Sequence, residues 1–118
     1  MSASSPFIPS LEHLTRQRGV LGSLIVSETD GIVIDAVVQA TVKAPVVAAL
    51  AASLYRRARQ SAQAAGLGGV KYLELVADGG RLCMAGRDDL VVVLVTDTRV
   101  GVGLLRVELL RTAAELPE

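Results

Sequence analysis

The chain has 118 residues, and its twelve basic and twelve acidic side chains give a formal net charge of zero at pH 7. This length supports one domain with a single hydrophobic core. The core is expected to be aliphatic, because only 3% of the residues are aromatic. With neither a basic excess nor interleaved aromatic residues, the composition argues against nucleic-acid binding.

Compartment and membrane insertion can be predicted from the cysteine count and the apolar runs. Cys83 is the only cysteine, so an internal disulfide is impossible and a reducing compartment is indicated. Met1–Ser10 lacks the basic start and apolar run of a signal peptide, and no apolar run is long enough to span a membrane. We therefore expect a soluble, cytoplasmic domain over residues 1–118, with residues 1–8 flexible.

The first part of the chain predicts a helix and a hairpin. Pro9–Arg18 is typical of a short helix, with Leu11 and Leu14 facing inward. Val20–Ser27 is apolar on both faces, which favours a central strand. The Asp-Gly pair at 30–31 predicts a hairpin turn into a second strand, Ile32–Val38.

Ala44–Gly66 is the longest helix-forming run in the chain. Pro45 suits the first helical turn, and Gly66 is suited to end the helix. At about 100° per residue, apolar side chains cover an arc of about 200°, nearly twice the stripe of about 100° that a surface helix needs. One half of the arc contains Leu50, Leu54, Val47, Ala65, Ala58 and Ala51, and the other contains Ala62, Tyr55, Ala48 and Ala52.

The width of this arc predicts a second contact. We expect the half around Leu50 to cover the chain's own sheet and the small-residue half around Ala52 to remain for another protein. On this interpretation, Ala52→Arg would separate a dimer without unfolding the domain. The alternative is a helix buried entirely within its own domain.

The second part of the chain predicts three strands and a helix. Val70–Ala77 carries Lys71 and Glu74, charges that are typical of an edge strand. Arg81–Gly86 and the very apolar Leu90–Thr96 follow after short turns, and the last helix is expected over Gly101–Glu115. In that helix Leu105, Leu109 and Leu116 share one stripe, while Arg111 and Glu115 form an exposed pair. The two most apolar strands should lie side by side in the middle of the sheet.

Two stretches resemble the roadblock/dynein light chain family. They are GVLGSLIVSETDGIVIDAV (Gly19–Val37) and LVVVLVTDTRVGVGLLRVELLRTAAEL (Leu90–Leu116). The resemblance spans Leu11 to Leu116 and consists of core patterns rather than catalytic signatures. It implies an α+β fold of the order α-β-β-α-β-β-β-α, with a five-stranded antiparallel sheet. The long helix would cover one face and the two terminal helices the other.

The resemblance also implies partners. Family members are similar in forming dimers, in which the third strands pair and the long helices lie side by side. The expected dimer interface comprises Ala48, Ala52, Tyr55, Arg59, Ala62, Lys71, Tyr72, Leu73, Glu74 and Leu75. Bacterial and archaeal members are often associated with Ras-like small GTPases, so the second expected partner is such a GTPase. The candidate contacts with it are Ser53, Arg56, Arg57 and Gln60.

The sequence contains no residue pattern that predicts a catalytic, cofactor-binding or metal-binding site. His13 is interpreted as a surface residue, Cys83 as an inert buried thiol and Asp88-Asp89 as turn formers. The arginines at 56, 57 and 59 could in principle act on a phosphate, but a solvated rim around an interface is favoured over an arginine finger. The sequence therefore predicts a non-catalytic, homodimeric regulator or scaffold for a Ras-like GTPase. The alternative is a small-molecule sensor or a general protein-interaction domain of the same architecture.

Overall fold

The computed structural model describes residues 5–99 and 101–117 and contains three helices and five strands in that part of the chain. In chain order they are α1 (Ile8–Thr15), β1 (Val20–Ser27), β2 (Val33–Val38), α2 (Ala44–Ala64), β3 (Leu73–Ala77), β4 (Gly80–Arg87), β5 (Leu90–Thr96) and α3 (Gly103–Ala114). The predicted order and fold class are confirmed.

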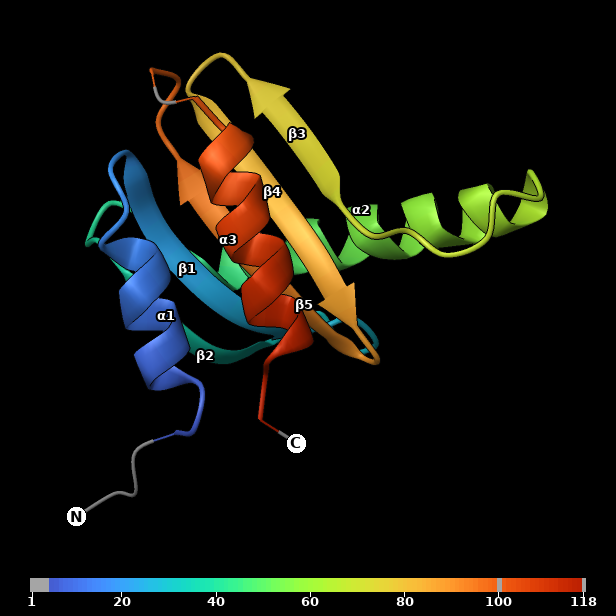
Figure 1. Ribbon diagram of the computed structural model, residues 1–118, viewed down its shortest axis with the longest axis horizontal. Helices are drawn as coiled ribbons and strands as arrows, with labels where there is room; N and C mark the ends of the chain where they lie inside the picture. Colours follow the sequence, from blue (N-terminus) through green and yellow to red (C-terminus); the bar gives the residue numbers. More distant parts are fainter. Residues whose placement is uncertain (1–4, 100, 118) are drawn as a thin grey trace.

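The five strands form one antiparallel sheet in the order β2-β1-β5-β4-β3 (Figure 1). The apolar strands β1 and β5 lie side by side at its centre, as predicted, because their side chains are buried on both faces. β3 lies at one edge, which its charges predicted, and β2 lies at the other.

Two clusters of buried side chains lie on opposite faces of the sheet. On one face α1 and α3 contribute Leu11, Leu14, Leu105 and Leu109, which pack against Ile25, Val92 and Leu94 of the central strands. On the other face α2 packs against Leu24, Val26, Met84, Val91 and Val93. The arrangement of the three helices implied by the family resemblance is therefore confirmed (Figure 1).

The end of α2 follows the glycine signal in the sequence. Gly66 adopts a φ of 77°, in the left-handed region that glycine enters with little strain. Its N–H donates to the carbonyl of Gln63 at 3.1 Å, and the N–H of Leu67 donates to the carbonyl of Ala62 at 2.8 Å. These two bonds form a Schellman cap, so the prediction that Gly66 ends the helix is confirmed.

β3 begins three residues later than predicted, at Leu73 rather than Val70. The reason is the hydroxyl of Tyr55 on α2, which donates to the carbonyl of Val70 at 2.6 Å and accepts the N–H of Gly86 at 3.0 Å. The hydroxyl therefore lies between β4 and the segment before β3. Its two hydrogen bonds take the place of the backbone hydrogen bonds that would otherwise pair these segments. The local sequence pattern could not predict this contact, because the side chain comes from another element of the fold.

Smaller differences occur at the ends of the chain. Residues 1–4 of the predicted flexible segment lie outside the described residues, whereas Phe7 packs against the core and Ile8 begins α1. In α3, Arg111 pairs with Glu108 at 2.8 Å rather than with the predicted Glu115. The inward positions of Leu11, Leu14 and the α3 leucines are confirmed.

Candidate interaction surface

The inner face of α2 is made of small residues. Ala48, Ala51 and Ala52 are buried against the sheet, and Tyr55 is buried beside them. The helix lies close to the hairpin turn, because a Cβ added to Gly31 would be 3.9 Å from that of Ala52. The prediction that Ala48, Ala52 and Tyr55 are free for another protein is therefore wrong, because this half of the arc covers the chain's own sheet.

The outer face of α2 carries the larger apolar side chains. Leu50 is 44% exposed, Val46 is more exposed still, and Val47 and Leu54 are only half-buried. The double-width arc in the sequence was correct, but the half left for another protein packs on the sheet. Of the half expected on the sheet, Ala51 is buried and Val47 and Leu54 pack against the core, whereas Leu50 is exposed. Leu50 and Val46 were not predicted as interface residues, although the width of the arc was the signal for them.

The second half of α2 extends beyond the edge of the sheet (Figure 1). From Gln60 to Gly69 every residue is exposed except Ala62, which is half-buried. Leu67, just after the helix, is among the most exposed large apolar residues. This extended segment carries alanines among polar side chains and is followed by the exposed Leu67, so little of its own chain covers it and another protein can contact it.

An apolar groove lies on the same face of the sheet, between the first half of α2 and the β3–β4 hairpin. Its volume is about 230 Å³, and its apolar lining includes Leu21, Val47, Leu50, Leu75, Leu82 and Val95. The groove exists because α2 crosses the sheet obliquely and leaves the upper ends of β3, β4 and β5 uncovered (Figure 1).

The predicted interface residues of β3 divide between the two faces. Leu73 packs on the α2 side, and Leu75 lines the groove there. Tyr72 turns to the other face, where its hydroxyl donates to Glu74 at 2.9 Å and its ring lies 5.7 Å from the Arg106 guanidinium. Burial raises the pKa of this hydroxyl. Lys71 is exposed before the strand, and no described strand pairs with the outer edge of β3.

The arginines of α2 have different environments. Arg59 forms an ion pair with the buried Glu28, with its Nε 3.1 Å from Oε2, and Arg56 donates to the Glu28 carbonyl at 3.3 Å. Arg57 is exposed, together with Ser53 and Gln60. Arg59, predicted at the dimer interface, is therefore engaged within its own chain. The sequence reasoning missed Glu28, a glutamate directly after an apolar strand.

Asp89, in the β4–β5 turn, holds the β1–β2 turn in place. Its carboxylate accepts hydrogen bonds from the Ser27 hydroxyl at 3.0 Å, the Thr29 N–H at 3.0 Å and the Thr29 hydroxyl. The side-chain hydrogen bonds from Thr29 and Ser27 lower the pKa of Asp89. The interpretation of Asp88-Asp89 as turn formers agrees with this role, with Asp88 at a φ of 55°.

Protonation of the Asp89 carboxylate should lower the free energy of unfolding of the domain in acid. Because its pKa is lower in the folded state, its contribution is present above its unfolded value of about 3.9 and is lost as the pH falls through the folded value. In Asp89→Asn, urea unfolding should therefore change less between pH 5 and pH 2 than in the wild type. Asp88→Asn is the matched control, because the structure gives the Asp88 carboxylate no hydrogen bond among the described residues. An equal acid response in Asp89→Asn and the wild type would contradict this role.

His13 and Cys83, the candidate chemical groups of the sequence, lie in different environments in the described part of the chain. His13 is exposed on α1 and lies 3.3 Å from a carboxylate oxygen of Glu108. Cys83 is fully buried, and burial raises the pKa of its thiol, which makes it less reactive. Among the described residues, no group of three or more metal-ligating side chains comes together.

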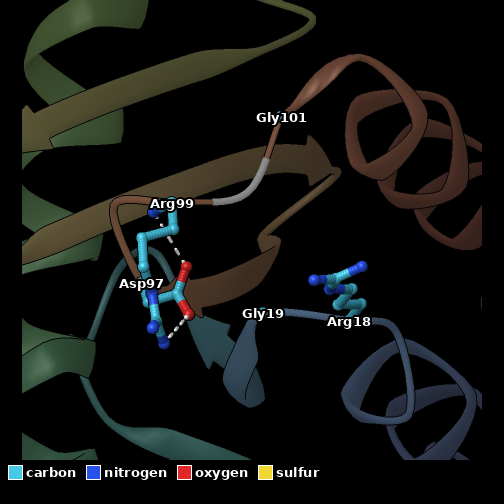
Figure 2. Close-up of a pocket in the computed structure, with 5 residues that line it drawn as sticks. All are labelled: Arg18, Gly19, Asp97, Arg99 and Gly101. Carbon is cyan, nitrogen blue, oxygen red and sulfur yellow. Dashed lines mark hydrogen bonds and ion pairs between the residues drawn. The ribbon is translucent and has the colours of Figure 1, made fainter.

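A hollow of about 560 Å³ lies where β5 ends and β1 begins. Figure 2 shows Arg99 folded back onto Asp97 on one side and Arg18 on the other, with Gly19 and Gly101 completing the lining. The Arg99 Nη2 lies 3.3 Å from Asp97 Oδ2. The described residues of the lining are charged residues and glycines, whereas small-molecule pockets are lined mostly by apolar side chains.

The protein is a single sheet with helices on both faces, and its most distinctive surface is an apolar helix face beside the outer edge of β3, with which no described strand pairs. No helix in the described part of the chain is both long and apolar enough to cross a membrane.

Comparison with known proteins identifies the family. The model of the Roadblock/LC7 domain matches residues 10–96. An uncharacterised protein of Methanocaldococcus jannaschii is 30% identical over 106 residues, which cover 90% of this chain and 89% of that protein. The chain therefore belongs to the Roadblock/LC7 family, as the resemblance implied.

Solved structures show the same fold at lower sequence identity. Myxococcus xanthus MglB has a TM-score of 0.84 and 19% identity, over 98% of this chain and 94% of that one. The Roadblock/LC7 domain from Streptomyces avermitilis has a TM-score of 0.80 and 18% identity, over 89% of each chain.

Proposed function

We propose that this protein is a cytoplasmic, non-catalytic homodimer that regulates or scaffolds a Ras-like small GTPase. The observation that carries the proposal is the apolar outer face of α2 beside the unpaired edge of β3. Family membership supports it, because the resemblance that first indicated this family implies both a dimer and a GTPase partner.

The proposed dimer uses complementary parts of one surface. The extended half of α2 from one copy would lie over the groove of the other, where Leu50 and Leu75 are exposed. A two-fold axis between the copies would repeat the same contact, as in most homodimers. The outer edges of the two β3 strands could then pair and satisfy their free backbone groups. This interface replaces the predicted seam at Ala48, Ala52 and Tyr55, while Ala62, Leu73 and Leu75 remain in it.

The proposed GTPase contact lies on the solvent side of α2. On a helical wheel, Ser53, Arg57 and Gln60 lie within about 60° of one another on the polar border of the apolar outer face, and Arg57 lies about 20° from Leu50. Arg59 is unsuited to serve as a finger, because reaching a bound nucleotide would leave Glu28 buried without its ion pair. Among the three arginines of α2, Arg57 is the best placed to contact the GTPase, because the rigid helix holds it exposed at the border of the apolar face.

The test compares binding and hydrolysis by Arg57→Ala and wild type with the Ras-like GTPase that a pull-down from the same host identifies. Loss of a rim contact of about 1.4 kcal/mol should weaken binding about tenfold. At saturation, the hydrolysis rate should stay the same, because any effect on rate would come from selecting one conformation of the GTPase. Arg18→Ala, at the opposite end of the sheet, is the control.

Two results would refute this proposal in different ways. If no Ras-like GTPase binds the wild type, the partner is wrong. If Arg57→Ala binds normally but the saturated rate falls about a thousandfold, Arg57 is an arginine finger and the protein acts catalytically on its partner.

A further inference from the structure

A hollow of about 250 Å³ lies between the second half of α3 and the segment that leads into β3. Its lining includes Val70 and Lys71 on one side, Ala85 and Gly86 of β4 on the floor, and Leu110 and Ala114 of α3 on the other side. The α2 groove is on the opposite face of the sheet, because α2 and α3 cover different faces (Figure 1). The hollow is thus separate from the proposed dimer and GTPase contacts.

The hollow exists because the pairing of β3 with β4 ends early. The ladder stops at Leu73 and Met84. Beyond it, the Tyr55 hydroxyl accepts the N–H of Gly86 at 3.0 Å and donates to the Val70 carbonyl at 2.6 Å. A side chain from the α2 side therefore joins the two segments there, and an open space remains on the α3 side.

The α3 wall of the hollow is more apolar than folding requires. Leu110 is 37% exposed and Val107 57%, whereas the helix packs on the sheet through Leu105, Leu109 and Ala113. A surface helix needs only that one stripe. At about 250 Å³ the hollow is smaller than the roughly 300–1,000 Å³ of pockets that hold a small molecule. Its size therefore suits one apolar side chain of a larger partner rather than a whole ligand.

Positive charge borders this apolar hollow. Lys71 in its lining is exposed and forms no hydrogen bond or ion pair among the described residues. Arg106, one helical turn before Leu110, is exposed and lies 5.7 Å from the centre of the Tyr72 ring, without a carboxylate partner in the described part of the chain. The described lining contains no acidic residue. An anionic partner would therefore make charge contacts here that the chain itself does not supply.

The other charged residues nearby are engaged within the chain. Arg87, at the end of the hollow, caps α3, because its Nη1 donates to the Ala114 carbonyl at 3.4 Å and to the carbonyl of Leu116. Glu74 of β3 accepts the Tyr72 hydroxyl at 2.9 Å. Arg87 therefore fixes one end of the hollow, and Lys71 and Arg106 are the basic groups that face a partner.

We propose that this hollow binds a short acidic segment of another protein. An apolar side chain of the segment enters between Leu110 and Lys71, and the carboxylates that flank it contact Lys71 and Arg106. The aliphatic stem of Lys71 can lie along the anchoring side chain while its ammonium group reaches a carboxylate. The proposal does not rest on the proposed function, because it concerns the other face of the sheet. One anchor and two exposed charge contacts give weak binding, with a Kd between about 1 μM and 1 mM.

The acidic side chains on the far border of α3 favour such a segment over an anionic membrane surface. Glu108 lies toward α1, 3.3 Å from His13, and Glu115 lies within about 20° of Glu108 on a helical wheel. Glu12 on α1 is also exposed. A flat anionic surface across the two helices would meet these carboxylates, whereas a segment in the hollow meets only the basic border.

Fluorescence anisotropy with a labelled peptide of sequence EEDLLDEE tests the proposal. The wild type should bind it, and the uncharged peptide QQNLLNQQ should bind about tenfold more weakly. Lys71→Glu should weaken the binding of EEDLLDEE about tenfold, because it places a carboxylate against those of the peptide. Lys43→Glu, the same change at an exposed position before α2, is the matched control and should bind as the wild type does.

Arg106→Glu tests the second charge contact from α3 rather than from the segment beside β3, and it should weaken binding similarly. The double variant of Lys71→Glu with Arg106→Glu should instead bind the basic peptide KKKLLKKK more tightly than the wild type does. Circular dichroism and light scattering should show an unchanged fold and mass in each variant, which separates loss of peptide binding from a change in the dimer.

Four results would overturn the proposal. They are a wild type that does not bind EEDLLDEE at millimolar concentration, equal binding of the uncharged peptide, equal binding by Lys71→Glu and Lys43→Glu, and binding to vesicles of phosphatidylserine and phosphatidylcholine that Lys71→Glu abolishes. The last result would make a membrane surface the occupant.

Discussion

Replacing Ala52 by arginine should unfold this domain. Ala52 is buried on the inner face of α2, in contact with the apolar cluster on that side of the sheet. An unpaired guanidinium there costs about 3–5 kcal/mol, a large part of the 5–15 kcal/mol that stabilises a typical domain. The steric demand of the longer side chain adds to this, because the helix lies close to the hairpin turn at Gly31.

The matched control is Ala49→Arg, the same change on the exposed face of the same helix. Urea unfolding followed by circular dichroism should show the control close to the wild type and Ala52→Arg largely unfolded without denaturant. A folded, monomeric Ala52→Arg would instead support the seam expected from the sequence and would refute the burial described here.

The strands could be predicted closely because their signals are local. Val20–Ser27 and Leu90–Thr96 are bounded by turn residues and are mostly apolar on both faces, and both appear with the predicted ends. Burial on both faces also placed them at the centre of the sheet. β3 was the exception, since its start depends on the Tyr55 hydroxyl, which comes from another element.

The orientation of α2 could not be predicted, because periodicity gives the width of an apolar arc but not which part faces inward. Placing the larger leucines inside seemed natural, since a leucine buries more apolar area than an alanine. The sheet receives Ala48 and Ala52 in addition to the expected Ala51, and the small size of these residues allows close approach. Leu50 then remains outside, where a second protein could cover it.

The polar side-chain contacts near the candidate site could not be predicted from the sequence either. Glu28 and Arg59 are 31 residues apart, and Ser27 and Asp89 are 62 apart. Neither pair has a spacing that belongs to a helix or a hairpin. Two separate turns and a helix must come together before these side chains can meet, and only the tertiary structure specifies that.

Replacing Leu50 by glutamate should convert the proposed dimer into a folded monomer. Leu50 is 44% exposed in the single chain, so the carboxylate can remain hydrated there and the fold should be preserved. In the dimer the same carboxylate would be buried in the groove without a partner, at a cost of several kcal/mol. Light scattering on a sizing column at micromolar concentration should show the mass of the variant halved relative to the wild type.

Ile32→Glu is the control for Leu50→Glu, because Ile32 is 56% exposed beside the β1–β2 turn, away from the groove. It introduces the same charge in place of a residue of the same size and should remain dimeric. A wild type that is monomeric at micromolar concentration would refute the dimer itself. A Leu50→Glu variant that keeps the full dimer mass would show that the copies meet elsewhere, because the groove cannot close over an unpaired carboxylate.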